Sequence, residues 1–408
     1  MKTERMMTGE GLKGFAWVLT ALAMALTGTG CGEGDVADAS DQAPRTVCVD
    51  GQCGLMAASA SDAGTDAGTS IDAGWDLDAG PCDSTPYDPK LGTLQIQPGF
   101  VAGESAPLPA AAGPVGVTPG PTYSLYTLVS GIYHGPHALY SLGTWPQLSL
   151  GSAPLLDMSP SGLPNYSSYF VETDGQRVIT GVNYPGTVGV YDIATPAAST
   201  YIPLTNLTAA GVVPGAFLLT TRPLGNPPGG AGATETLAAL RTDTTPLTQT
   251  TVATFPSESQ RSASVSVSTH GALMVSYYET SSFIKARVVA PATIAQALTS
   301  GMPFSLADAP VMDVGSRFTR TAGHGEGLSV LRGSIPAPGF PYTYSDVSRF
   351  PITVTNAGAT VTVGSRQPIL VFLDRCTSVT DMKAIGPDLL LGVQDKNGRR
   401  LVRIQQAP

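Results

Sequence analysis

The sequence predicts an all-β fold, a β-propeller of six blades, and three observations carry this prediction. The 408 residues include 47 glycines and 34 prolines but only 13% charged residues, which favours turns and strands over helices. Strand-turn-strand units recur around Asp174–Gly175 and His270–Gly271, and a repeat of about 50 residues with four short strands is typical of a propeller blade. The segment TVGVYDI, 187–193, is apolar on both faces, as a strand covered by two neighbouring blades must be.

Six strand-like segments mark the expected blades, and seven is the neighbouring count. They are HALYSLG (137–143), TVGVYDI (187–193), ETLAALR (235–241), FIKARVV (283–289), PYTYSDV (341–347) and RRLVRIQ (399–405). The competing fold is a tandem β-sandwich, which also uses many short strands joined by Pro and Gly turns. Residues 91–408 contain no stretch with the composition of an interdomain linker, which counts against two domains.

The two ends of the expected propeller carry a closure signal. The last unit, residues 388–405, contains an Asn-Gly hairpin and then lacks a strand. We expect GTLQIQPGF, Gly92 to Phe100, to supply that strand and close the ring. One short helix is expected over PATIAQALTSG, Pro291 to Gly301, because a proline opens it and a glycine ends it.

One stretch resembles a known repeat family. VITGVNYPGTVGVYDIATPAASTYIPL, 178–204, is similar to the YVTN family of propeller repeats: a strand, a short Gly-containing turn, a strand ending in Asp, then Ala-Thr and a final strand. The resemblance covers about 30 residues of one blade. It implies a propeller fold, and some YVTN-like propellers are lactonases or redox enzymes with metals or cofactors in the central channel. Residues of such sites cannot be matched here one by one, so no catalytic residue and no cofactor are predicted.

The N-terminus has the order of a secretory signal peptide, predicted for residues 1–30. Basic residues precede the apolar run Gly14 to Leu26, which is too short to span a bilayer comfortably. The run TGTGCG resembles the lipobox of bacterial lipoproteins, although Gly28 stands where that family usually carries Leu. The resemblance implies that Cys31 is the lipidation site and the mature N-terminus. The alternative is an ordinary signal peptide cut nearby.

Residues 31–90 are predicted to be a tether rather than a folded domain. The segment Gly32 to Lys90 has 12 acidic and two basic residues, and it repeats Asp-Ala-Gly over Ser61 to Gly80. Such a chain has too little apolar surface to offset its conformational entropy, and its charges repel one another. The organisation is therefore a signal peptide, a lipidated Cys with a disordered acidic spacer, and a β-propeller over residues 91–408.

Four cysteines remain after Cys31, and an even set in an exported protein indicates disulfides rather than a metal site. Asp-Gly at the centre of CVDGQC makes a turn that brings Cys48 and Cys53 together. Cys82 and Cys376 are then left to pair, which would clamp the start of the propeller to its last part. In the chain-entropy model, such a long loop contributes about 4 to 5 kcal/mol.

The usual hydrolase, protease and nucleotide-binding motifs are absent from the sequence. The weak candidates for a metal site are His134, His137, His324 and Glu326, which could meet at one propeller mouth. The simpler interpretation is that they are turn residues, so no metal is predicted. Dispersed tyrosines in the first unit, including Tyr126 and Tyr140, could line a carbohydrate surface, although strand packing is the more frequent explanation for such residues.

Two long Gly/Pro-rich connections are the candidate binding loops, because they are too long for tight hairpins. They are GNPPGGAGATE, with Asn226 and Gly230, and GSIPAPGFPY, with Pro336 and Phe340. The neutral domain has no basic run, which argues against nucleic acid.

The leading functional hypothesis is an exported protein that is held at the outer membrane or cell surface by its N-terminal lipid. Its propeller would bind a protein or glycan partner of the cell envelope. The alternative is a propeller enzyme, such as a lactonase-like hydrolase, that acts on a small exported substrate. Because catalytic motifs are absent from the sequence, the binding hypothesis is favoured over the enzyme.

Overall fold

The computed structural model describes residues 46–49, 52–55, 86–130, 137–158, 168–182, 187–203, 207–221, 234–256, 264–278, 284–314, 317–334 and 343–408. The chain divides into two units, Met1–Ala67 and Gly68–Pro408. In the first unit, β1 (Thr46–Val49) and β2 (Gln52–Leu55) form an antiparallel hairpin whose backbone register places Cys48 opposite Cys53. The signal peptide and most of the acidic spacer lie outside the described residues.

The second unit consists of six β-sheets, each of them one blade, and the strands of each blade are named A to D from the inside outward. Blade 1 contains β5 (Ala112–Val117), β6 (Ser124–Ser130), β7 (His137–Thr144) and β8 (Gln147–Leu148), with β9 (Leu156–Asp157) also paired to β7. Blade 2 contains β10 (Ser168–Thr173), β11 (Arg177–Val182), β12 (Thr187–Asp192) and β13 (Thr200–Pro203). Blade 3 contains β14 (Leu207–Val213), β15 (Ala216–Thr221), β16 (Thr234–Arg241) and β17 (Thr248–Pro256), followed by β21 (Phe304–Ser305).

The remaining three blades follow the same plan. Blade 4 contains β18 (Ser264–Val267), β19 (Leu273–Tyr278), β20 (Ile284–Val289) and β22 (Val311–Met312). Blade 5 contains β23 (Arg317–His324), β24 (Gly327–Ser334), β25 (Thr343–Thr355) and β27 (Gln367–Phe372), with β26 (Thr360–Val363) paired to β25 and β3 (Leu94–Ile96) added outside β27. Blade 6 contains β28 (Ser378–Ile385), β29 (Asp388–Asp395), β30 (Gly398–Gln406) and β4 (Phe100–Pro107).

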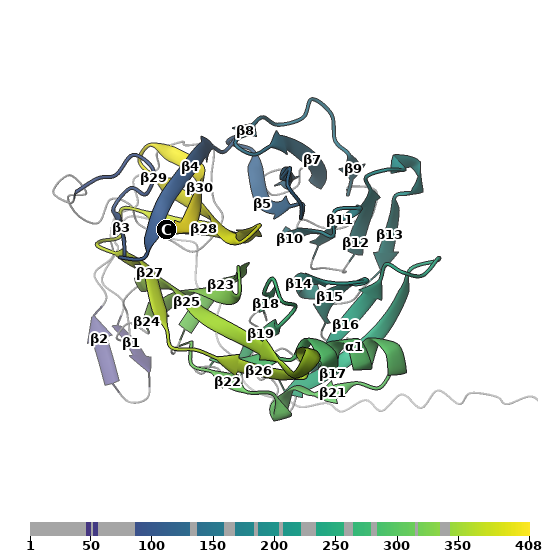
Figure 1. The fold of residues 1–408 in the computed structure, drawn as a ribbon. Coiled ribbons are helices and arrows are strands. Elements are labelled where there is room, and N and C mark those ends of the chain that lie inside the picture. The colour runs from purple at the N-terminus through teal and green to yellow at the C-terminus, as the bar shows by residue number, and fades with distance from the viewer. Residues whose placement is uncertain are drawn as a thin grey trace, which may run out of the picture. The chain divides into compact units, whose positions relative to one another are not determined.

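The six A strands form a closed ring, which confirms the predicted six-bladed β-propeller. Each A strand lies against the next in the order β5, β10, β14, β18, β23 and β28, and β28 returns to β5. Figure 1 shows the blades arranged around this ring. All six segments predicted as blade landmarks fall on the C strands β7, β12, β16, β20, β25 and β30. The alternative prediction of a tandem β-sandwich is therefore wrong.

The hydrophobic core is divided among the six contacts between neighbouring blades. Six separate clusters of buried apolar side chains occur, and each draws its residues from two adjacent blades. The strand TVGVYDI illustrates the pattern predicted from its two apolar faces: Val188 and Val190 pack toward blade 3, whereas Tyr191 packs toward blade 1. Apolar burial of this kind is what holds successive blades together.

The ring is closed by an N-terminal strand, but not by the one predicted. β4 pairs with β30 and completes blade 6, while β3, from the predicted segment 92–100, pairs with β27 at the edge of blade 5. The chain reverses between them at Gln97–Phe100, where Gly99 has φ of 90° and the Phe100 N–H donates to the Gln97 carbonyl. The prediction that the N-terminal segment closes the ring is confirmed, and its strand assignment is wrong.

The one predicted helix is present as α1 (Pro291–Ser300), which ends at Gly301 with φ of 69°. Ile294 and Ala297 are buried in the cluster between blades 3 and 4, so the helix covers that contact. In the part of the chain that the structure describes, three short 3₁₀ turns lie in connections between strands: Pro196–Ala198, Leu306–Asp308 and Asn356–Gly358. Within the described residues, no helix is both long and apolar enough to cross a membrane.

Candidate functional site: a pocket at one mouth of the propeller

One end of the propeller carries the turns between the A and B strands of all six blades, and this end is called the A–B mouth. Turns of neighbouring blades contact one another directly there. The Thr269 N–H donates to the Gly325 carbonyl over 2.9 Å, joining blades 4 and 5. A Cβ built on Gly325 would lie 3.0 Å from the Pro387 carbonyl oxygen of blade 6, and one on Gly175 would lie 3.3 Å from the Pro119 ring. The opposite end, which carries the connections between B and C strands, is called the B–C mouth.

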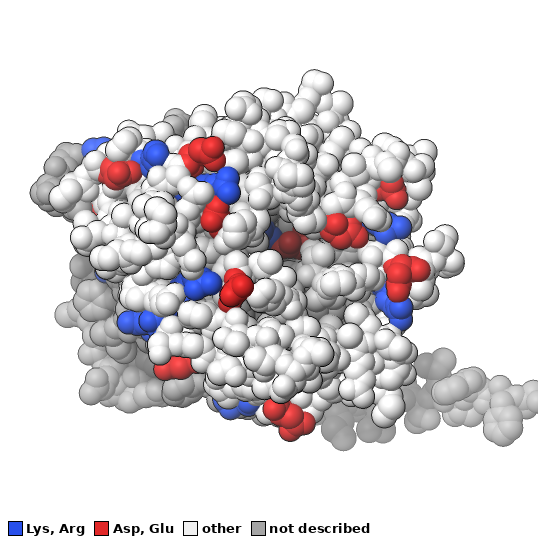
Figure 2. Space-filling model, viewed as in Figure 1, with Lys and Arg blue, Asp and Glu red and all other residues white. Residues whose placement is uncertain are grey.

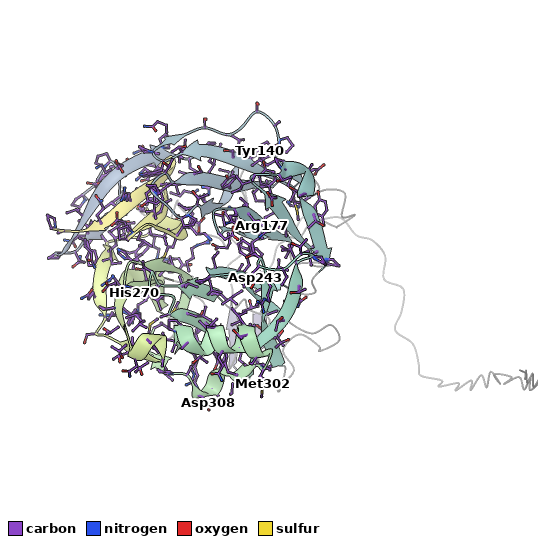
Figure 3. All side chains as sticks on the ribbon, turned by 45° about the vertical axis from the view of Figure 1, so that its right-hand side comes forward. Tyr140, Arg177, Asp243, His270, Met302 and Asp308 are labelled. Carbon is purple, nitrogen blue, oxygen red and sulfur yellow. The ribbon has the colours of Figure 1, made fainter. Side chains whose placement is uncertain are left out.

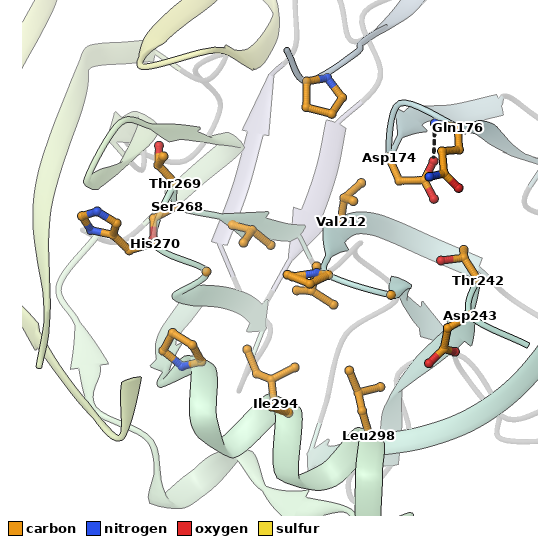
Figure 4. Close-up of a pocket in the computed structure, with 18 residues that line it drawn as sticks. Asp174, Gln176, Val212, Thr242, Asp243, Ser268, Thr269, His270, Ile294 and Leu298 are labelled. Carbon is orange, nitrogen blue, oxygen red and sulfur yellow. Dashed lines mark hydrogen bonds between the residues drawn. The ribbon is translucent and has the colours of Figure 1, made fainter. Parts of the chain in front are cut away.

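A pocket of about 800 Å³ opens at the A–B mouth, between the turns of blades 1 to 4 and the helix α1 (Figure 4). Its apolar surface comes from prolines and aliphatic side chains, including Pro214, Pro291, Ile294 and Leu298. Among the described lining residues, none is a phenylalanine, tyrosine or tryptophan. A volume of this size lies in the range usual for ligand pockets, so the site can take a molecule or a protruding peptide segment.

Polar side chains form the rim of the pocket on two sides. Figure 4 shows Asp174, Thr242 and Asp243 on one side, with Thr269 and His270 across from them. Figure 3 places Asp243 and His270 on the inner part of the ring.

The two carboxylates on this rim differ in how many of their oxygens already accept hydrogen bonds within the protein. Asp174 Oδ1 accepts the N–H groups of Gln176 and Arg177, over 2.9 and 2.7 Å, whereas Oδ2 accepts no hydrogen bond among the described residues. Asp243 forms a bidentate pair with Arg241, with distances of 2.9 and 2.5 Å. Hydrogen bonds from this guanidinium hold the pKa of Asp243 below its ordinary value. Asp174 is therefore the carboxylate with a free acceptor oxygen.

His270 is the histidine of this rim, and it contacts the neighbouring blade. Its Nε2 lies 3.5 Å from Glu326 Oε1, and the two side chains are 48% and 71% exposed. No serine or threonine hydroxyl among the described residues is hydrogen-bonded to His270. The pair is consequently a surface contact between blades 4 and 5 and not an assembled nucleophile and base.

The residues considered as weak metal candidates are not brought together. His324 ends β23 at the A–B mouth, and His137 begins β7 at the B–C mouth. Glu326 lies at the A–B mouth, and His134 is outside the described residues. Among the described residues, no group of three or more His, Cys, Asp or Glu side chains could hold a metal ion.

The two described histidines of that set are both buried. His324 is 1% exposed, its Nδ1 lies 3.0 Å from Ser329 Oγ, and its ring packs at 6.0 Å from that of Phe100. Burial, together with the positive charge of Arg349, lowers the pKa of His324 to about 3. His137 is 7% exposed, and burial lowers its pKa. Both rings are neutral core residues at pH 7.

Of the predicted binding loops, the four named residues Asn226, Gly230, Pro336 and Phe340 lie outside the described residues. The strands that flank them are β15 and β16 in one case and β24 and β25 in the other. Both connections therefore join B to C strands, and the described strand ends that flank them lie at the B–C mouth. The pocket lies at the other end of the propeller. The role predicted for the loops stays a prediction.

Of the tyrosines considered for a carbohydrate surface, Tyr126 is buried between blades 1 and 2. Figure 3 shows Tyr140 at the outer edge of the ring. The described tyrosines thus do not form a stacking platform at the pocket.

Charged side chains also occupy the central channel. Lys383 on β28 pairs with Glu172 on β10 and donates to the Val171 carbonyl over 3.2 Å, so blade 6 is linked to blade 2 across the A strand of blade 1. Burial alone would lower the pKa of Lys383, but attraction by Glu172 and Asp381 raises it above the ordinary value. Figure 2 shows acidic and basic side chains scattered over the visible face around a central hollow. The Lys383–Glu172 pair is a structural contact between the A strands of blades 6 and 2.

The structure describes only some of the cysteines for which disulfide bonds or lipidation are predicted. Cys376 is disulfide-bonded, while Cys82, its predicted partner, lies outside the described residues. Its neighbourhood ties the N-terminal segment to the connection between blades 5 and 6, because Thr93 Oγ1 donates to Asp374 Oδ1 and the Thr93 N–H donates to Thr377 Oγ1. The pairings Cys48–Cys53 and Cys82–Cys376 stay predictions, as does lipidation of Cys31.

Sequence reasoning missed the lining residues of the pocket, including Asp174. A signal was present in the repeat: the turns at Asp174–Gly175 and His270–Gly271 occupy equivalent places in blades 2 and 4. Equivalent turns of a propeller lie at the same mouth, so the two positions could have been assigned to one rim. The contribution of α1 to the pocket has no comparable signal, because it depends on where the helix packs.

The fold and the site define a six-bladed β-propeller with a pocket at one mouth. No protein-family model matches the chain, and no curated protein matches it in sequence. Among solved structures, an acylaminoacyl peptidase from Pyrococcus horikoshii matches over 73% of this chain at 10% identity and a TM-score of 0.40, and this chain spans 46% of that protein's length.

Two further solved structures match over most of their own length. A protein of unknown function from Dyadobacter fermentans matches over 76% of this chain and 100% of its own, at 10% identity and a TM-score of 0.48. The β-propeller domain of the trilobed protease from Pyrococcus furiosus matches over 72% and 81%, at 8% identity and a TM-score of 0.42. Likenesses of this size carry no argument about function, and the fold stands on the blade topology.

Proposed function

We propose that this chain is an exported, lipid-tethered β-propeller whose A–B mouth binds a protein partner in the cell envelope. The observation that supports the binding role is the pocket, which is formed by turns of four blades. A rigid propeller holds such turns in fixed positions, so they can recognise a partner without a change in the scaffold. His270 lacks a hydroxyl partner among the described residues, which favours binding over hydrolysis.

A protein partner is preferred over a glycan because of the chemistry of the lining. Sugar rings are commonly held by stacking on aromatic side chains, and the described lining offers prolines and aliphatic groups instead. Aliphatic surface beside a few polar groups suits a protruding peptide segment.

The tether is the second part of the proposal, and the acidic spacer with the lipobox-like Cys31 supports it. Membership of the YVTN-like propellers rests on the blade 2 stretch alone. The spacer would hold the propeller away from the bilayer, because its charges repel one another and extend the chain.

Filling the pocket is expected to abolish partner capture. Ala295 lines the pocket and is exposed on α1, so Ala295→Trp places an indole in the cavity without entering the core. Gln296→Trp is the matched control, because this exposed neighbour on the same helix is not a lining residue. In cross-linking of intact cells followed by mass spectrometry, Ala295→Trp should reduce the specific partner at least tenfold, while Gln296→Trp should leave it unchanged. Equal capture by both variants would refute the binding role of the pocket.

Cys31→Ser is expected to move the mature protein from the membrane to the soluble fraction. The physical reason is that acyl chains on Cys31 would insert into the bilayer and hold the mature chain there, and a serine at that position could not carry them. Fractionation with an immunoblot, together with mass spectrometry of the N-terminal peptide, measures the result. If the Cys31→Ser protein has lost its signal and still sediments with membranes, the lipid tether is wrong.

A further inference from the structure

The charge of the pocket is one-sided. Apart from His270, the described lining residues that ionise are Asp174 and Asp243, and no lysine or arginine is among them. The nearby guanidiniums already have acidic partners: Arg177 lies 3.8 Å from Asp192 Oδ2 and donates to the Thr242 carbonyl over 3.0 Å, and Arg241 pairs with Asp243 and donates to the Leu298 carbonyl over 2.7 Å. The pocket therefore presents negative charge to an incoming ligand.

The negative charge available to a ligand is located at Asp174, at the carboxylate oxygen that accepts no hydrogen bond within the described residues. Oδ1 accepts hydrogen bonds within the turn between β10 and β11, and Oδ2 is left to accept a hydrogen bond from a ligand. Asp174 is partly buried, and the aliphatic side chains Val212, Ile294 and Leu298 line the same pocket. A hydrogen bond to a charged group is stronger in such surroundings than at an open surface.

An aliphatic pocket beside one available carboxylate matches a particular side-chain chemistry. Lysine and arginine each combine an apolar stem with a cationic head, so the stem can lie on the aliphatic surface while the head reaches Asp174. The pocket volume of about 800 Å³ exceeds what one such side chain needs, which leaves room for flanking aliphatic residues or proline. The chain's own acidic spacer does not fit, since its net charge of −10 would be repelled.

We propose that the pocket binds a basic peptide segment of the partner. A lysine or arginine of this segment is held by Asp174, and the residues that flank it in the segment are aliphatic. This proposal rests on the proposed function and specifies the partner's chemistry. Asp174 is a specificity-determining residue at this site, and Asp243 serves mainly to fix Arg241 and the end of α1.

The test uses a phage-displayed library of random dodecapeptides selected on the full chain, with Ala295→Trp as the pocket-blocked control. Peptides that depend on the open pocket should contain several times more Lys and Arg than Asp and Glu, next to aliphatic residues or proline. A selected peptide should bind Asp174→Asn about tenfold to a hundredfold more weakly. This substitution keeps the Oδ1 acceptor of the turn, so the fold should be retained.

Asp308→Asn is the matched control for charge, because Asp308 is exposed and lies at the outer edge of the ring in Figure 3. It should leave peptide affinity unchanged, and added salt should weaken binding to the native pocket. Pocket-dependent peptides without basic enrichment, or with equal affinity for Asp174→Asn, would overturn this inference and leave the binding role standing. A selection without any pocket-dependent peptide would also overturn it, while the cross-linking result with Ala295→Trp decides the proposed function separately.

Discussion

Below about pH 6, the native protein is expected to lose stability with falling pH more steeply than a His324→Gln variant, by about 1.4 kcal/mol per pH unit. The pKa of His324 is lowered to about 3, because its ring is buried and faces the positive charge of Arg349. In the unfolded chain the same ring titrates near its ordinary value of 6.5.

The direction follows from proton binding in the two states. Between these two pKa values the unfolded chain binds one more proton than the folded chain, so acid favours unfolding. The stabilisation is complete above about pH 6.5 and is lost as the pH falls toward 3. Acidic groups contribute to the pH dependence of both proteins, and the difference in slope isolates His324.

Urea unfolding followed between pH 7.5 and 4.5 measures this difference. His270→Gln is the matched control for the loss of a histidine, since that ring is exposed at the mouth. Equal slopes for the native protein and His324→Gln would contradict the assignment. In the native protein, NMR titration provides a second measurement, in which the His324 ring should stay neutral down to about pH 4.

Gly323→Ala is expected to destabilise the propeller by about 3 kcal/mol, because it forces two blades apart. A Cβ at Gly323 would lie 2.1 Å from the Val267 carbonyl oxygen of blade 4, which is backbone and cannot rotate away. Hydroxyls bridge the same contact, with Thr321 Oγ1 lying 2.8 Å from Ser264 Oγ and 2.5 Å from Ser266 Oγ. Separating the blades would stretch these hydrogen bonds as well.

Gly151→Ala is the control for this substitution, because the nearest atom to its Cβ would be the Ser141 carbonyl oxygen at 3.4 Å, an ordinary contact. It should change the free energy of unfolding by less than about 1 kcal/mol. Urea unfolding at pH 7 compares the two variants. A Gly323→Ala protein as stable as Gly151→Ala would show that blades 4 and 5 can separate at little cost.

Several features of this protein were determined by the sequence alone. The repeat and the doubly apolar strand around Val188 predicted a six-bladed propeller, and all six landmark segments are C strands. The helix over Pro291 to Gly301 was predicted with its proline start and glycine end. These features depend on hydrogen bonding and side-chain alternation within a few residues, or on a pattern repeated in every blade, so a single chain displays them.

Other features were decided only by the tertiary structure. β4 pairs with blade 6 and β3 pairs with blade 5 because those strand edges remain open after the other strands have paired. The residues of segment 92–100 do not by themselves indicate which edge will be open. The distance between His137 and His324 follows from the opposite ends at which their strands place them. The pocket joins Asp174, His270 and Ile294 from three parts of the chain, because its shape arises from packing between blades. Local sequence specifies each strand and turn, whereas a site shared by four blades exists only once long-range contacts have set them side by side.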